Sequence, residues 1–160
     1  MDEQSDLVDQ FYRPFIRSLG NLVIAFAQSE AALLDLVSEI HNGDEMAAVV
    51  VLKAPNAKNQ ILDSTEQIGL TGFDLDELRR GVNDFWSDKE IRNRLMHDQW
   101  YPSIMRGGEV ATRGLTRKKS VEIVHRCPAV EDCWALVRRF QHYDDIFSFR
   151  AHMLRKARSH

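Results

Sequence analysis

Three side chains between Arg92 and His97 have the functional groups that phosphate-ester chemistry requires. The stretch IRNRLMHDQWYP, residues 91–102, places Arg92, Asn93 and His97 within six positions. An imidazole titrates near neutral pH and can move protons, and a guanidinium binds phosphate bidentately and stabilises its charge. An amide can orient a hydroxyl group or a phosphate oxygen. Such a set could cleave RNA without a metal ion, because RNA supplies its own nucleophile in the 2′-hydroxyl group.

The helix that carries these residues decides whether they can meet. An α-helix turns by about 100° per residue, so Asn93 and His97 share a face while Arg92 lies about 140° from His97. Arg92 reaches the imidazole only by its long side chain, at a distorted helix end or across a dimer interface. The alternative is a structural role. Bases in a last turn favour the negative end of the helix dipole, and Glu90 and Arg94 form an ordinary i,i+4 pair.

The hydrophobic pattern predicts one mainly α-helical domain over residues 1–160. It indicates an up-and-down bundle of about five helices, with a small β-hairpin or three-stranded flap before the last helix. The helices are expected near residues 10–41, 44–54, 57–69, 75–98 and 128–158. The flap is expected over about residues 100–126, with strands near 109–115 and 121–124.

Two apolar stripes define the longest helices. In the first helix the stripe comprises Leu19, Leu22, Val23, Phe26, Leu33, Leu34, Val37 and Ile40. Pro14 is expected to mark the start of this helix, because proline is tolerated in a first turn, and His41-Asn42-Gly43 is a stop signal. In the last helix the stripe comprises Val130, Cys133, Val137, Phe140, Phe147, Ala151 and Leu154.

The motif Arg92-Asn93-x3-His97 resembles the signature of HEPN domains (higher eukaryotes and prokaryotes nucleotide-binding). That signature is an arginine, usually followed by a polar residue, with a histidine after four to six further positions near a helix end. The expected order of long and short helices is similar to that family as well. Two positions depart from the pattern. Gln99 stands where members regulated by a nucleotidyltransferase often have a tyrosine. Asp98 follows the histidine where a small residue is common, and its carboxylate would repel phosphate.

The resemblance implies an α-helical bundle that is commonly a homodimer, with the motif at or near the subunit interface. In catalytic members it implies a metal-independent endoribonuclease, in which Arg92 stabilises the transition state, His97 acts as general acid or base and Asn93 positions the substrate. Many such proteins belong to toxin–antitoxin, phage-defence or RNA-processing systems, so an antitoxin-like protein partner is a further expectation. Other members have lost catalysis.

Basic and aromatic residues around the expected flap are candidates for nucleic-acid binding. A basic flap could follow a phosphate backbone, with Trp100 and Tyr101 as stacking platforms. The alternative is a solvated hairpin whose charges resist edge pairing, with both aromatic residues anchoring the flap on the core. The candidate set is Arg94, Trp100, Tyr101, Arg113, Arg117, Lys118 and Lys119.

Composition and charge exclude several functional classes. No apolar run is long enough to cross a bilayer, the acidic N-terminus is not a secretory signal, and two cysteines suggest a cytoplasmic protein without a disulfide framework. The first fifty residues hold nine acids and two bases, and the last sixty hold six acids and twelve bases. Unless folding interleaves these segments, the surface is polarised and attracts polyanions.

We expect neither a metal nor a cofactor. His125, Cys127, Cys133 and His142 follow no familiar zinc spacing, and a buried cysteine in an apolar stripe ordinarily acts as a small hydrophobic residue. No Gly-rich phosphate loop, paired-carboxylate motif or nucleophilic serine elbow is visible. Three hypotheses remain open: a metal-independent ribonuclease, a non-catalytic module that binds RNA or a nucleotide, and a structural dimer or partner-held subunit.

Overall fold

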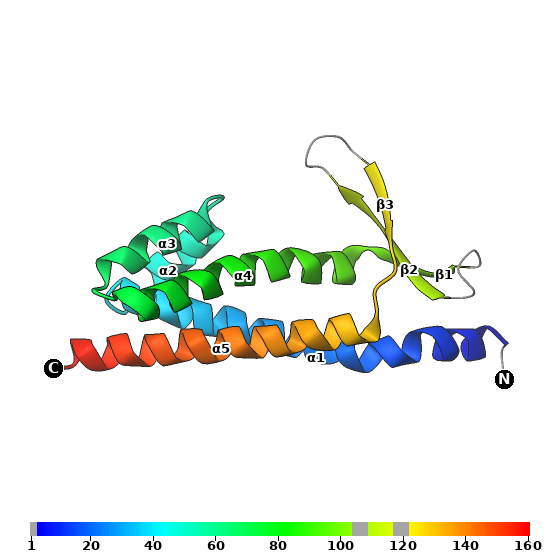
Figure 1. The fold of residues 1–160 in the computed structure, drawn as a ribbon, viewed down its shortest axis with the longest axis horizontal. Helices are drawn as coiled ribbons and strands as arrows, with labels where there is room; N and C mark the ends of the chain where they lie inside the picture. The colour runs from blue at the N-terminus through cyan, green and yellow to red at the C-terminus, as the bar shows by residue number, and fades with distance from the viewer. Residues whose placement is uncertain (1–2, 104–108, 117–121) are drawn as a thin grey trace.

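Three long helices form the body of the molecule (Figure 1). This computed structural model describes residues 3–103, 109–116 and 122–160. The long helices are α1 (Glu3–Ile40), α4 (Gly72–His97) and α5 (Val130–Arg158), and the short ones are α2 (Glu45–Lys53) and α3 (Ala57–Gln67). The predicted mainly α-helical bundle with a small sheet before its last helix is confirmed. In the described part of the chain, no helix has both the length and the apolar character needed to cross a membrane.

The long helices alternate in direction and share an aromatic core. α1 and α5 lie side by side and run parallel, and Glu39 near the end of α1 accepts a hydrogen bond from Arg155 of α5 at 2.7 Å (Figure 1). α4 runs antiparallel to both. Phe85 of α4 meets Phe26 of α1 and Phe140 of α5 with ring centroids 6.0 and 5.8 Å apart. These aromatic contacts bury a large apolar area where the three helices meet.

Two sequence predictions about α1 are wrong. The helix begins at Glu3 and continues through Pro14, which was expected to mark its start. Pro14 is exposed, so the lost backbone hydrogen bond is tolerated, and the next residue, Phe15, is buried against Val110 and Cys133 in a second apolar cluster. Val23 was expected in the buried stripe, but it is 43% exposed and lies outside the core.

The small sheet follows α4 directly. Strands β1 (Gln99–Ser103), β2 (Glu109–Thr116) and β3 (Glu122–Arg126) pair antiparallel in the order β1-β2-β3. Tyr101 faces Ala111 across the first pair of strands, and Arg113 faces His125 across the second. The predicted flap over about residues 100–126 is therefore confirmed as a three-stranded sheet, and it stands beside the end of α4 (Figure 1).

Candidate functional site

The motif occupies the last turns of α4, and the helix ends immediately after it. Asp98 has extended backbone angles (φ −70°, ψ 148°) as the C-cap, and its amide still donates to the carbonyl of Arg94 at 2.9 Å. β1 begins at the next residue, so helix and strand join without a loop. This junction holds the last turn of α4 against the sheet.

Arg92 lies between α4 and α1 as a half-buried cation. Its guanidinium carbon is 4.4 Å from the centroid of the Phe26 ring, and its Nη1 donates to Oδ1 of Asn93 at 3.0 Å. Its Nε is buried and has no hydrogen-bond partner. Across the described residues, no carboxylate pairs with Arg92, whereas the other buried or half-buried arginines, Arg79, Arg126 and Arg150, each do. Arg92 therefore has stacking and an amide contact in place of a counter-ion.

His97 and Asn93 share a face of α4, as the helical period requires. His97 is exposed and Asn93 is half-buried. Within the part of the chain that the structure describes, no hydrogen bond joins the imidazole of His97 to Arg92 or Asn93. One chain thus brings Arg92 and Asn93 together and leaves His97 at the surface of the same helix end.

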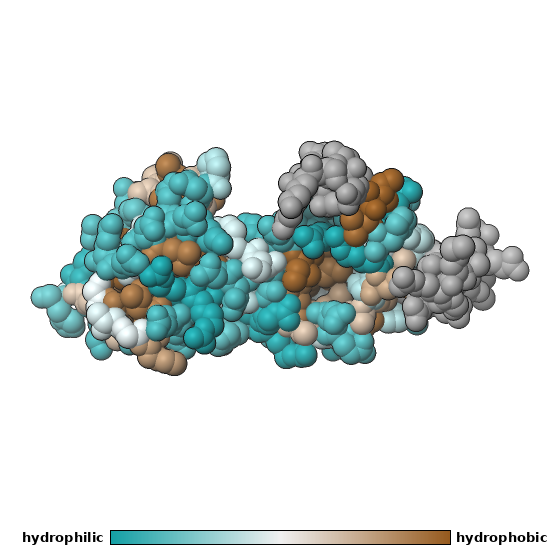
Figure 2. Space-filling view, turned by 45° about the horizontal axis from the view of Figure 1, so that its top comes forward, coloured by the Kyte–Doolittle hydropathy of each residue, from teal (hydrophilic) through white to brown (hydrophobic). Residues whose placement is uncertain are grey.

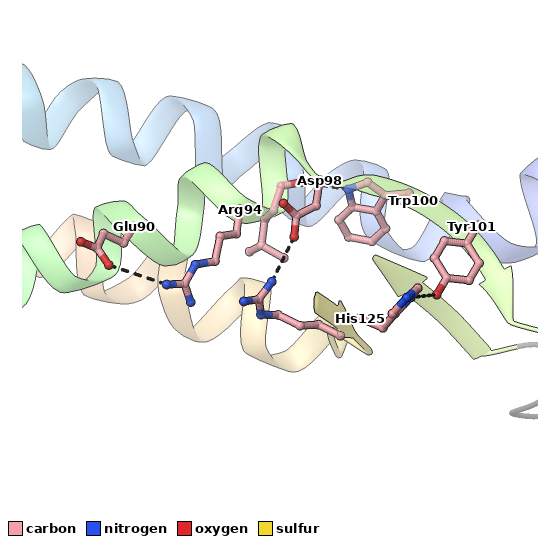
Figure 3. Close-up of polar contacts among 8 residues, drawn as sticks. Glu90, Arg94, Asp98, Trp100, Tyr101 and His125 are labelled. Atoms are coloured by element: carbon pink, nitrogen blue, oxygen red, sulfur yellow. Dashed lines mark hydrogen bonds and ion pairs between the residues drawn. The ribbon is translucent and has the colours of Figure 1, made fainter. Parts of the chain in front are cut away.

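Asp98 points toward the sheet. Its side chain is only 11% exposed and pairs with Nη1 of Arg126 at 3.3 Å (Figure 3). Gly114 of β2 allows this approach, because a Cβ atom at that position would overlap the Asp98 carboxylate. The negative charge of Asp98, which was expected to repel a phosphate at His97, is therefore paired with Arg126.

Replacing Gly114 by alanine is expected to destabilise the fold by about 1–3 kcal/mol, because the added methyl group must displace the carboxylate of Asp98, which is mostly covered and paired with Arg126. Thermal and denaturant unfolding would measure the loss. Gly81→Ala is the matched control, since its Cβ would make ordinary contacts of 3.6–3.8 Å with Ile146 and Phe147 and alanine favours a helix. Equal melting temperatures for the two variants would contradict the prediction.

The predicted nucleic-acid-binding residues fall into two groups. Trp100 anchors the sheet on the helices, and Tyr101 makes its contact within the sheet (Figure 3). The indole N–H of Trp100 donates to the carbonyl of Leu95 at 2.9 Å and its ring packs edge-on against Phe15, while the hydroxyl of Tyr101 is 2.6 Å from Nδ1 of His125. The contacts therefore support the anchoring role for Trp100, whereas Tyr101 links β1 to β3 within the sheet.

The basic candidates are placed only in part. Arg94 is exposed and pairs with Glu90 at 3.7 Å, and Arg113 donates from Nη2 to Oε1 of Gln99 at 2.7 Å. Arg117, Lys118 and Lys119 lie outside the described residues. The motif and the described part of the basic flap therefore form no common contact network.

A cleft of about 370 Å³ opens on the other side of α4, between the helix end, the sheet and the start of α5. Apolar and charged residues line it together, among them Leu95, Asp98, Arg126 and Arg139. In Figure 2, apolar atoms lie beside the sheet near the middle of the face, bordered by hydrophilic ones. Arg92, Asn93 and His97 do not line this cleft, so it is separate from the motif.

Sequence analysis did not consider Trp86 as a candidate site residue; it is half-buried and packs against the main core. Its ring packs edge-on against Phe85 and borders two hollows on either side of α4. Trp86 precedes Asn93 by seven residues and His97 by eleven, so it lies on the same helix face as both. That register was the available signal, but Trp86 also continues the apolar pattern of α4, and pattern alone assigns it to the core.

The four residues considered for zinc are dispersed. Cys133 is fully buried, and burial raises the pKa of its thiol, so the metal-binding thiolate is disfavoured. His125 contacts Tyr101, as described above. Among the described residues, no group of three or more histidine, cysteine, aspartate or glutamate side chains is arranged to hold a metal ion.

Comparisons with family models, with curated proteins and with solved structures found no match to this chain.

Proposed function

We propose that the chain is a metal-independent endoribonuclease of HEPN type, in which Arg92 and Asn93 bind the scissile phosphate and His97 transfers a proton. The observation that carries this proposal is the state of Arg92. A half-buried guanidinium without a carboxylate partner is electrostatically costly, and a phosphate oxygen would complement it. Stacking on Phe26 at 4.4 Å and the bond to Asn93 at 3.0 Å already hold the group in one orientation, which reduces the entropy lost on binding.

The reaction needs only groups from this chain and from RNA. The 2′-oxygen attacks the adjacent phosphorus, the bond from phosphorus to the 5′-oxygen breaks, and the proton lost from the 2′-hydroxyl is balanced by the one gained at the 5′-oxygen. His97 is exposed at the helix end and performs one of these proton transfers. Arg92 stabilises the charge that develops on the phosphate oxygens. The products are a 2′,3′-cyclic phosphate and a 5′-hydroxyl end.

A second copy of the chain completes this proposed site. Arg92 and His97 lie about 140° apart around α4, so the guanidinium of one copy would meet the partner's His97. Exposed apolar residues on α1 support such an interface, because Ile16, Val23 and Ile24 are 61%, 43% and 59% exposed. Val23 is also three positions from Phe26, and the Arg92 guanidinium stacks on the ring of Phe26. Two-fold symmetry would then create two identical sites.

Mixing inactive variants tests both the chemistry and the shared site. Arg92→Ala and His97→Ala chains are each expected to cleave RNA at least about 100-fold more slowly than the wild type in the presence of a chelator. Co-expressed in equal amounts, they should regain about a quarter of the wild-type rate, because about half of the dimers are mixed and each mixed dimer holds one intact site. Products would be followed on labelled single-stranded RNA, with cyclic-phosphate ends identified by mass.

The control pairs Arg92→Ala with a chain that carries both substitutions, which leaves no intact site. A mixture of the single variants that stays inactive would contradict a site shared between two copies. A wild-type chain that never cleaves RNA would overturn the nuclease, and salt-sensitive RNA binding without turnover would then identify a non-catalytic module. As part of the same proposal we place the protein in the cytoplasm, where RNA and an antitoxin-like partner would be available.

A further inference from the structure

Trp86 lies along one line on the surface of α4 with Asn93 and His97, the two residues of the motif that share a helix face. Seven and eleven residues separate Trp86 from Asn93 and His97, and both spacings return to within about 20° of the same direction on an α-helix. Eleven residues span about 16 Å along the helix axis. A single strand of RNA lying along this face would therefore reach Trp86 a few nucleotides from the motif.

The Trp86 ring is held in place and partly open. Its centroid is 5.3 Å from that of Phe85 at an interplanar angle of 68°, which fixes the indole on the helix. The ring borders a hollow of about 310 Å³ formed by α1, α2 and α4, and another of about 300 Å³ formed by α3 and α4. A ring that is held in place and borders two hollows offers a surface on which a base can stack.

Most of the charged side chains that line the two hollows beside the Trp86 ring are basic. The two hollows are lined by four bases and two acids: Lys53, Lys58, Lys89, Arg94, Glu30 and Glu90. Lys89 pairs with Glu30 at 2.8 Å, and its Nζ lies 6.0 Å from the centre of the Trp86 ring. Lys53 and Lys58 take part in no ion pair with any residue that the structure describes.

We propose that Trp86 is the base-stacking platform of a subsite for single-stranded RNA, with Lys53 and Lys58 contacting the phosphates on either side. A π-face flanked by uncompensated cations is the combination that binds single strands without sequence readout. Trp100 does not offer this surface, because its indole N–H and its ring are engaged in anchoring the sheet, and the hydroxyl of Tyr101 is engaged by His125. The inference rests on the proposed ribonuclease function, since it extends the substrate path of that site.

The test measures binding in a chain that cannot cut its ligand. In the His97→Ala background, Trp86→Leu is expected to weaken the binding of a labelled oligouridine of about ten nucleotides roughly ten-fold, the factor that corresponds to one stacked base. Trp86→Phe should retain most of the affinity, because a ring remains. Phe149→Leu is the matched control, an aromatic residue of α5 that is 54% exposed and distant in sequence from this surface. Circular dichroism would verify that each variant is folded.

Abasic scanning locates the stacked base. Removing one base at a time along the oligonucleotide should weaken binding at one position in the His97→Ala chain and have no effect there once Trp86 is leucine. Equal affinities for the Trp86 variants, or a scan without such a position, would overturn the subsite and leave the ribonuclease standing if the wild-type chain still cleaves. Equal competition by polyglutamate would also overturn it, in favour of an acidic protein ligand. Failure to bind and to cleave any RNA would overturn both proposals.

Discussion

His97→Ala is expected to lower the rate of RNA cleavage by about 10²- to 10⁴-fold, the contribution of a positioned general acid or base. His97 is exposed and outside the buried core, so the variant should fold and bind RNA like the wild type. Arg92→Ala is expected to cost about 10²- to 10³-fold through lost transition-state stabilisation. Single-turnover cleavage of labelled RNA in chelator would measure both rates.

Matched residues elsewhere in the chain separate catalysis from general charge effects. His142 and Arg80 are exposed and outside the motif, and alanine at either position should leave the rate unchanged. Arg92→Lys keeps the positive charge but loses the planar group that stacks on Phe26, so it should remain well below the wild-type rate. Cleavage that persists in both His97→Ala and Arg92→Ala would show that other residues perform the reaction.

Asp88→Ala is expected to lower the free energy of unfolding by about 3 kcal/mol. The buried Asp88 carboxylate accepts hydrogen bonds from Nε and Nη2 of Arg139 at 2.7 and 3.0 Å, and from the hydroxyl of Tyr143 at 2.6 Å. Burial raises the pKa of Tyr143, so its hydroxyl stays protonated and acts as a donor. Without Asp88 this buried donor has no acceptor, while the half-exposed Arg139 regains water, which limits the loss.

Chemical denaturation would measure this effect against two controls. Asp76 is an exposed carboxylate on the same helix, and Asp76→Ala should change the midpoint little. Tyr143→Phe removes only one of the donors and should cost about 1 kcal/mol. If Asp88→Ala unfolded at the same denaturant concentration as Asp76→Ala, the network between α4 and α5 would not contribute to stability.

Local signals in the sequence predicted most of the helical framework. Asp44 caps α2 by accepting a hydrogen bond from the amide of Ala47 at 2.9 Å, as a residue of its type before a helix indicates. Asn42 and Gly43 adopt φ values of 60° and 84° after α1, the left-handed conformation that ends a helix. Such signals involve residues within a few positions of one another, so they are visible before any tertiary contact is known.

Two residues were misplaced because tertiary packing overrides their local signals. Pro14 is a local start signal for a helix, yet burial of Phe15 against Val110 and Cys133 extends α1 beyond it. Val23 follows the periodicity of the buried stripe, but a period does not reveal how wide a face the neighbouring helices cover. Its 43% exposure is set by where α4 and α5 pack on α1.

The sequence by itself determined the chemical groups of the motif and their directions, because helical geometry alone sets Asn93 beside His97 and turns Arg92 away from His97. Only the tertiary structure decided their surroundings. It stacked Arg92 on Phe26 without a counter-ion and paired Asp98 with Arg126. It also engaged Trp100 in anchoring the sheet and left part of the Trp86 ring accessible. Each of these outcomes depends on residues that belong to different elements or on how those elements pack. The repeat of one helix specifies which side it buries, but not which side chains of another element it meets there.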